Sequence, residues 1–178
     1  MEMIFMLIII DGYNLIRQSV ELKRHERKSL EAGRNALLTR LNDYGKIKTH
    51  QMIVVFDGVQ KGRSEEGRDR SGRIDIIYSR HGERADDVIK RLAAHSGEEI
   101  IVVSSDREIS SYVTRLGRTS LSSPEFEAIM DKTLAADFSS FQEIEEDDDE
   151  PAKPLVKKGP SKKLPRARRK ARSKINKL

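Results

Sequence analysis

Three short apolar runs in this chain each lead into an aspartate. Two of them pass directly into Asp11 and Asp57, and the third reaches Asp106 after two serines. The runs cover residues 7–10, 53–56 and 100–103. Stretches of Ile and Val without polar alternation are typical of strands buried on both faces, as in a parallel sheet covered by helices. Because the carboxyl ends of parallel strands share one ligand-binding edge, we expect three carboxylates to meet there.

The composition limits the classes of protein to which this chain can belong. A chain of 178 residues is long enough for one domain with its own core. It has no cysteine, which excludes disulfides, thiolate zinc sites and cysteine nucleophiles and is compatible with a reducing cytosol. The apolar N-terminus enters Asp11 without a basic segment before it, so we predict a strand there and not a signal peptide. No segment reaches membrane-span length, and we therefore expect a cytoplasmic protein without a membrane partner.

Charge divides the chain into a body and a tail. Residues 1–142 hold 22 basic and 22 acidic side chains, residues 143–150 hold seven acids, and residues 151–178 hold twelve bases. Such a proline-containing, highly charged segment buries too little apolar surface to fold alone. We therefore predict a folded domain over 1–142 and a disordered acidic-then-basic tail over 143–178. The tail is either a basic arm that neutralises phosphates and becomes helical on a nucleic acid, or a solubilising segment paired with its own acidic run. The predicted RNA contacts in the tail are Arg166, Arg168, Arg169, Lys170 and Arg172.

Strands and helices are predicted to alternate along the body. The hydrophobic pattern predicts strands over 4–10, 52–56, 74–78, 99–103 and 118–121, and helices over 29–44, 83–96, 106–116 and from 123 onward. This alternation implies a doubly wound, mostly parallel sheet. The glycine-rich stretch 58–73 is predicted to be a mobile loop that either grips a phosphate backbone or is a solvated connection. Its basic residues are Lys61, Arg63, Arg68, Arg70 and Arg73.

The helix predicted over 83–96 contributes a fourth carboxylate. At 100° per residue its apolar side chains form one stripe, and Asp86 falls at the border of that stripe. Asp87 points away, where it has a structural explanation as a first-turn acid with Arg91 four residues later. The helical phase therefore favours Asp86 as the ligand.

The four aspartates together indicate a cation site. Each has a structural alternative, since Asp-Gly pairs form turns and Asp106 is a plausible helix N-cap. Acids clustered at one edge nevertheless repel one another unless a cation lies among them. Carboxylates without cysteine suit Mg²⁺ or Mn²⁺, ions that promote in-line hydrolysis of phosphodiesters. Asn14 either orients a water or a phosphate there, or is an ordinary loop amide.

At this point the motifs resemble a known family. The segments 10–15, 55–58, 78–80, 85–89 and 102–107 are similar to those of the YacP-like branch of the NYN domain, from about Ile4 to Met130. The resemblance implies a Rossmann-like, PIN-like three-layer fold that cuts RNA with bound Mg²⁺ or Mn²⁺. By position it implies metal ligation by Asp11, Asp57, Asp86 and Asp106. Many NYN proteins have Gly-Val-Asp where this chain has Arg84-Ala85-Asp86, which leaves Asp86 and Asp87 to be decided by helical phase. The tail after 141 is expected to lie outside the resemblance.

Two functions follow as hypotheses. The first is a metal-dependent endoribonuclease acting on single-stranded RNA, with mRNA and a ribosome as candidate partners and with Asp11, Asp86, Asp106 and Asn14 in the catalytic site. The alternative is a non-catalytic RNA-binding or ribosome-associated module with a vestigial acidic pocket. A phosphoaspartate phosphatase is disfavoured because Tyr13 stands where it needs a second acid. A response-regulator receiver is disfavoured because Ser122 and Ser123 stand where it needs a lysine.

Overall fold

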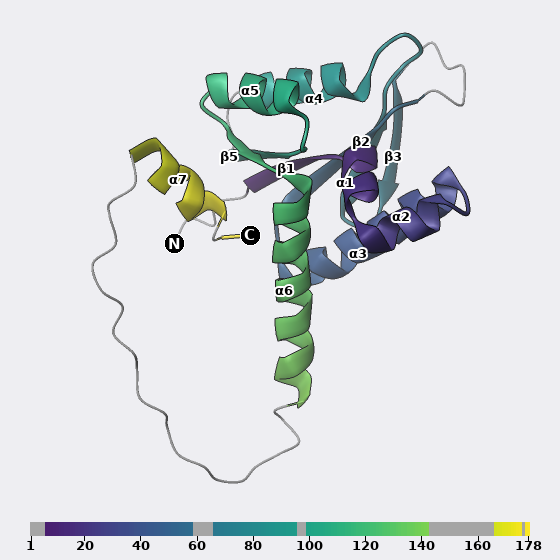
Figure 1. Cartoon of the computed structure of the whole chain (residues 1–178), viewed down its shortest axis with the longest axis vertical. Coiled ribbons are helices and arrows are strands. Elements are labelled where there is room, and N and C mark those ends of the chain that lie inside the picture. Colours follow the sequence, from purple (N-terminus) through teal and green to yellow (C-terminus); the bar gives the residue numbers. More distant parts are fainter. Residues whose placement is uncertain (1–5, 59–65, 96–98, 143–165, 176) are drawn as a thin grey trace. The chain divides into compact units, whose positions relative to one another are not determined.

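The computed structural model describes residues 6–58, 66–95, 99–142, 166–175 and 177–178 (Figure 1). Its contacts divide into two compact units, Met1–Leu134 and Ala135–Leu178, and each is described by itself. The first unit contains a single six-stranded sheet with helices on both faces.

The sheet is parallel except at one edge. Its strands are β1 (Met6–Asp11), β2 (Gln51–Phe56), β3 (Gly67–Ser71), β4 (Ile74–Tyr78), β5 (Glu99–Val103) and β6 (Thr119–Leu121). The spatial order is β3-β4-β2-β1-β5-β6, and only β3 pairs antiparallel. Strand β1 lies at the centre, between β2 and β5, where the direction of winding reverses. This is the topological switch point at which such sheets bind ligands.

The helices form two layers around this sheet (Figure 1). The helices of the first unit are α1 (Gly12–Gln18), α2 (Val20–Glu26), α3 (Leu30–Ile47), α4 (Ala85–Ala94), α5 (Arg107–Arg115) and the part of α6 (Ser123–Gln142) up to Leu134. One face of the sheet packs against α4 and α5, and the other packs against α1 and α3. The expected three-layer, mostly parallel α/β architecture is confirmed.

Successive side chains of the inner strands point to opposite faces of the sheet and pack against the helices on both sides. Ile9, Val55 and Ile77 pack with Val88 and Ile89 of α4 in one cluster, and all five are at most 4% exposed. The residues between them on the strands are also buried, because helices cover the opposite face. This double burial explains why the strands read as continuous apolar runs without polar alternation.

Two parts of the first unit differ from the sequence-based prediction. The stretch expected to be a loop contains β3, whose Arg68, Asp69 and Arg70 are exposed. Strand β3 is an edge strand that needs only main-chain pairing with β4, so its sequence has no apolar run that would predict a strand. Gly72, with a φ of 59°, forms the turn between β3 and β4. Helices α1 and α2 were not predicted either. Both are seven residues long, too short for a helical period to stand out.

The second unit contains one helix among its described residues outside α6, namely α7 (Arg166–Ile175). Arginine, lysine and alanine all have high helix propensity, which accounts for a helix in this basic segment. The division into a folded domain over 1–142 and a disordered tail over 143–178 stays a prediction. The rest of the predicted tail, 143–165, lies outside the described residues. Within the described part of the chain, no helix is long and apolar enough to cross a membrane.

Candidate active site

The carboxyl ends of three adjacent parallel strands bring the predicted acids to one edge of the sheet. Asp11 is the last residue of β1, Asp57 follows the end of β2, and Asp106 lies three residues beyond β5. Asp86 is the second residue of α4, whose N-terminus is tied to the same edge because the Ala85 N–H donates to Asp57 Oδ1 at 2.7 Å. Four segments thus supply carboxylates to one region.

Asp11 is the most deeply buried acid of the group. It is 8% exposed, and its pKa is raised from 3.8 to about 6, mainly by burial and in smaller part by the negative charges of Asp86 and Asp57. Two hydrogen bonds oppose this rise, from the Asn14 N–H at 3.2 Å and the Ser104 hydroxyl at 3.0 Å. The carboxylate is therefore desolvated and lies in the field of other acids, an environment that favours a bound cation.

Three of the four aspartates also act as helix caps. Asp11 caps α1 through the Asn14 N–H, and Asp106 caps α5 by accepting from Glu108 N–H at 2.7 Å. Asp57 caps α4 from a different strand, through the Ala85 N–H described above. Each of these acids has a structural role that accounts for its position without any ligand.

Asp86 has no such structural role. Its side chain is 17% exposed and makes an ion pair with Arg84 Nη2 at 2.7 Å. Burial raises its pKa, the Arg84 charge lowers it, and the charges of Asp106 and Asp57 raise it again. The neighbouring Asp87 is exposed and instead accepts a hydrogen bond from the Arg84 N–H at 3.3 Å. The predicted helical phase of these two acids is confirmed; the ligand role of Asp86 stays a prediction.

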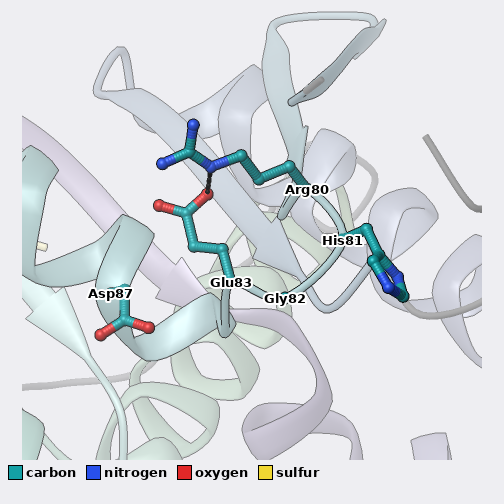
Figure 2. Close-up of a pocket in the computed structure, with 5 residues that line it drawn as sticks. All are labelled: Arg80, His81, Gly82, Glu83 and Asp87. Carbon is teal, nitrogen blue, oxygen red and sulfur yellow. Dashed lines mark ion pairs between the residues drawn. The ribbon is translucent and has the colours of Figure 1, made fainter. Parts of the chain in front are cut away.

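The segment that leads from β4 into α4 is fixed by a charge network. Figure 2 shows the ion pair between Arg80 and Glu83, with Gly82 between them in the chain and Asp87 on the first turn of α4. The two charged groups of the pair are 3.4 Å apart, and these residues line a hollow of about 620 Å³. Arg91 pairs with Glu83 and with Glu66, which directly precedes β3. The predicted pair between Asp87 and Arg91 is therefore wrong: Arg91 reaches two glutamates outside its own helix instead.

Asn14 connects three chain segments around the site. Its side-chain oxygen accepts from the Ser105 N–H at 2.9 Å and from the Ser123 hydroxyl at 2.7 Å. These bonds join the start of α1 to the connections after β5 and before α6. Asn14 thus holds the strand ends in register, which is a positioning role.

Sequence reasoning missed the residues that surround the acids. Ser104 donates to Asp11, and Arg84 and Lys90 partly neutralise Asp86. Arg84 lies two positions before Asp86 and Lys90 four positions after it, so sequence proximity for Arg84 and helical spacing for Lys90 could have predicted that both lie near this acid. No pattern in the sequence connects Ser104 with Asp11, because the two residues are 93 positions apart.

The acids fit a hard divalent cation in chemistry and in charge. They offer carboxylate oxygens only, the pKa values of Asp11 and Asp86 are raised in part by the charges of the other acids, and each ionised group keeps lone pairs beyond its present bonds. As the side chains stand, no three Asp, Glu or His residues of the described segments come close enough together to hold one ion. Because Asp86 is turned toward Arg84, ligation requires that side chain to rotate.

The basic residues predicted in 58–73 are not all near the acids. Arg68 lies toward the acidic edge, because its neighbour Gly67 pairs with Tyr78 at the carboxyl end of β4. Arg73 precedes β4, so about 13 Å of strand separates it from that edge. Arg68 and Arg70 are exposed but paired with Glu66 and Asp75, respectively. Lys61 and Arg63 lie outside the described residues.

Comparisons with known proteins identify the family of this chain. The family model described as the YacP-like NYN domain matches residues 8–169. The match extends into the tail, so the expectation that the tail lies outside the resemblance is wrong.

One curated relative and two solved structures are similar to this chain. The uncharacterized protein YacP of Bacillus subtilis (strain 168) is 32% identical over 88 residues, which are 49% of this chain and 51% of that protein. The match thus spans about half the length of the relative. Crystal structures of Rae1 (YacP) from Bacillus subtilis, one of them a mutant, have TM-scores of 0.65 and 0.63 at 23% and 24% identity. They cover 78% of this chain and 82% and 80% of theirs, and at these identities they show the shared fold.

Proposed function

This chain belongs to the YacP-like NYN domain family, and we propose from this premise that it is a metal-dependent endoribonuclease that hydrolyses phosphodiester bonds in single-stranded RNA. Membership of the NYN family, within the PIN-like nucleases, indicates an RNase. The metal dependence, mRNA as the substrate and a ribosome as the place of action are parts of our proposal. The proposed nuclease domain is 1–142, with 143–178 as a charged arm.

One observation carries this proposal. Asp86 lies half-buried beside Asp57 and Asp106, and its charge raises the pKa of Asp11, yet it caps no helix. The charge of Asp86 disfavours the ionised form of Asp11, and its own pKa is raised despite the nearby Arg84, so a bound cation would stabilise this group of acids. The other three acids have helix-capping roles that explain their positions. Asp86 caps no helix, so its position is the one that supports a functional site.

The proposed roles follow from the positions of the side chains. Asp11, Asp57, Asp86 and Asp106 would hold Mg²⁺ or Mn²⁺, which when bound supplies Lewis-acid stabilisation of the charge that develops on the phosphodiester. Ser104 and Asn14 keep Asp11 and the strand ends in place through their hydrogen bonds. Arg84 is free to contact a phosphate once Asp86 turns toward a cation. The expected products carry a 5′-phosphate and a 3′-hydroxyl.

Cleavage of labelled single-stranded RNA tests this proposal, with Asp86→Asn compared against Asp87→Asn. With Mn²⁺ or Mg²⁺ we expect the wild type to cut and EDTA to stop cleavage. Asp86→Asn should lose at least about a hundredfold in rate because it removes a ligand, whereas Asp87→Asn should stay within about threefold. The two variants remove the same charge from adjacent positions. Equal rates for both would contradict the assignment of Asp86.

The helix-capping roles of Asp11, Asp57 and Asp106 favour a second candidate, an RNA-binding or ribosome-associated module without catalysis. It predicts that RNA binds and is never cut, and that Asp86→Asn changes nothing. Repeating the assay with ribosome-bound mRNA separates a nuclease that needs its substrate presented from this module, because only the nuclease cuts there.

The basic residues are proposed to attract RNA without reading its sequence. They are Lys61, Arg63, Arg68, Arg70 and Arg73 in the body and Arg166, Arg168, Arg169, Lys170 and Arg172 in the arm. Deleting 143–178 should weaken RNA binding and make it less salt-dependent, by roughly 0.7 in the log–log slope for each phosphate that the arm neutralises. Titrations at several salt concentrations measure this slope. An unchanged slope would show that the arm neutralises no phosphates.

A further inference from the structure

A hollow of about 370 Å³ lies beside the acidic edge, between α5, β6 and the start of α6. Eight residues line it, of which six are serines and the other two are Arg107 and Glu125. We propose that this serine hollow binds the ribose and phosphate of a nucleotide adjacent to the scissile bond and so favours RNA over DNA. The inference rests on the proposed function, whose RNA substrate it describes in more detail.

The serine hollow is continuous with the site of the aspartates. Ser104 lines the hollow, and its hydroxyl donates to Asp11 Oδ2 at 3.0 Å while accepting from the Asp106 N–H at 3.1 Å. Ser105, also in the lining, donates its N–H to Asn14. A strand of RNA with its scissile phosphate at the aspartates would therefore place a neighbouring nucleotide at the hollow.

Unused hydrogen-bond donors face this space from α5. Arg107 and Ser111 are four residues apart, so they lie on the same side of the helix. Both are exposed, and neither side chain makes a hydrogen bond or an ion pair with any residue in the described part of the chain. A guanidinium beside a hydroxyl matches a phosphate oxygen beside a ribose hydroxyl.

The remaining lining residues favour the sugar-phosphate over the base. None of the eight described lining residues is aromatic, so the hollow offers no ring on which a base could stack. The carboxylate of Glu125 accepts from the N–H and the hydroxyl of Ser122 at 3.0 and 2.5 Å, so it is held at the start of α6, and Arg107 is the basic residue among the described lining residues. Serine hydroxyls both donate and accept, as does the 2′-hydroxyl that distinguishes RNA from DNA. The volume is in the range of about 300–1,000 Å³ typical of small-ligand sites.

Equilibrium binding of fluorescent oligonucleotides to the full chain in EDTA tests the proposal without any cleavage step. The probes are a short single-stranded RNA, the DNA of the same sequence and its 2′-O-methyl form. The wild type should bind the RNA more tightly than either other probe. Arg107→Ala should weaken RNA binding about tenfold, whereas Arg115→Ala, the same charge change at the far end of α5, should cost less than about twofold. Ser111→Ala should lower the RNA-to-DNA affinity ratio about threefold.

The outcomes separate this inference from the proposed nuclease. Three results would each contradict the proposed role of the serine hollow. They are equal effects of Arg107→Ala and Arg115→Ala, an unchanged RNA-to-DNA affinity ratio in Ser111→Ala, and a wild type that binds RNA and DNA equally well. Failure of the nuclease proposal would instead appear as uncut RNA with the binding preferences intact. The three substituted side chains are exposed, and matching thermal melts of the variants will show that the fold is kept.

Discussion

Replacing Asp11 with asparagine is expected to stabilise the metal-free protein at pH 8 by about 1–3 kcal/mol while reducing RNA cleavage about a thousandfold or more. Burial of this carboxyl raises its pKa from 3.8 to about 6. The folded state therefore binds the proton more tightly than the unfolded state does. As the pH rises from about 4 to about 6, the wild type loses free energy of unfolding, and the loss is complete above that window. The asparagine variant carries no charge to desolvate and lacks this loss.

Urea denaturation in EDTA across pH 4 to pH 8 measures the effect. The advantage of Asp11→Asn should be small at pH 4, where Asp11 is protonated in the fold, and should grow through pH 6. Any constant cost of weakening the hydrogen bond from Ser104 is present at every pH and cancels in the comparison. Mg²⁺ should then stabilise the wild type and not the variant. A difference between the two proteins that does not change with pH would show that the buried charge is not the cause.

Gly58→Ala is expected to lower the free energy of unfolding by about 2–4 kcal/mol and to impair cleavage as well. A Cβ at this position would lie 1.9 Å from the backbone oxygen of Ser79. Main-chain atoms cannot move aside as a flexible side chain can, so β2 and β4 would have to separate where Asp57 leaves the sheet. Because Asp57 holds the N-terminus of α4 through the Ala85 N–H, Asp86 would shift with it.

Gly117→Ala provides the matched control for this substitution. Gly117 has a φ of 72° and open space around its Cβ position, so alanine there adds backbone strain without a collision. We expect it to cost about 1 kcal/mol and to leave cleavage unchanged. Chemical denaturation and the RNA assay compare the two variants directly. If Gly58→Ala proved no less stable than Gly117→Ala, the close approach of Gly58 to Ser79 would be refuted.

Local patterns in the sequence were sufficient for most of the sheet. Strands β1, β2 and β5 are covered on both faces, so almost every residue in them is apolar and their apolar runs are easily recognised. Elements held by main-chain pairing or by single caps left no comparable signal, as β3 and α1 show. The helix of the basic segment, α7, was expected only on a nucleic acid, because a high charge was taken to outweigh strong helix propensity.

The sequence was sufficient to predict which acids share one edge of the sheet, whereas the surroundings of each acid depend on tertiary contacts. An aspartate after a buried parallel strand must lie at the carboxyl edge, so the placement of Asp11, Asp57 and Asp106 along that edge follows from chain direction alone. The burial of Asp11, the cap that Asp57 provides to α4 and the distinct position of Asp86 depend on contacts between segments 28 to 93 positions apart. No local pattern records such contacts, because desolvation and hydrogen bonding are properties of the packed chain.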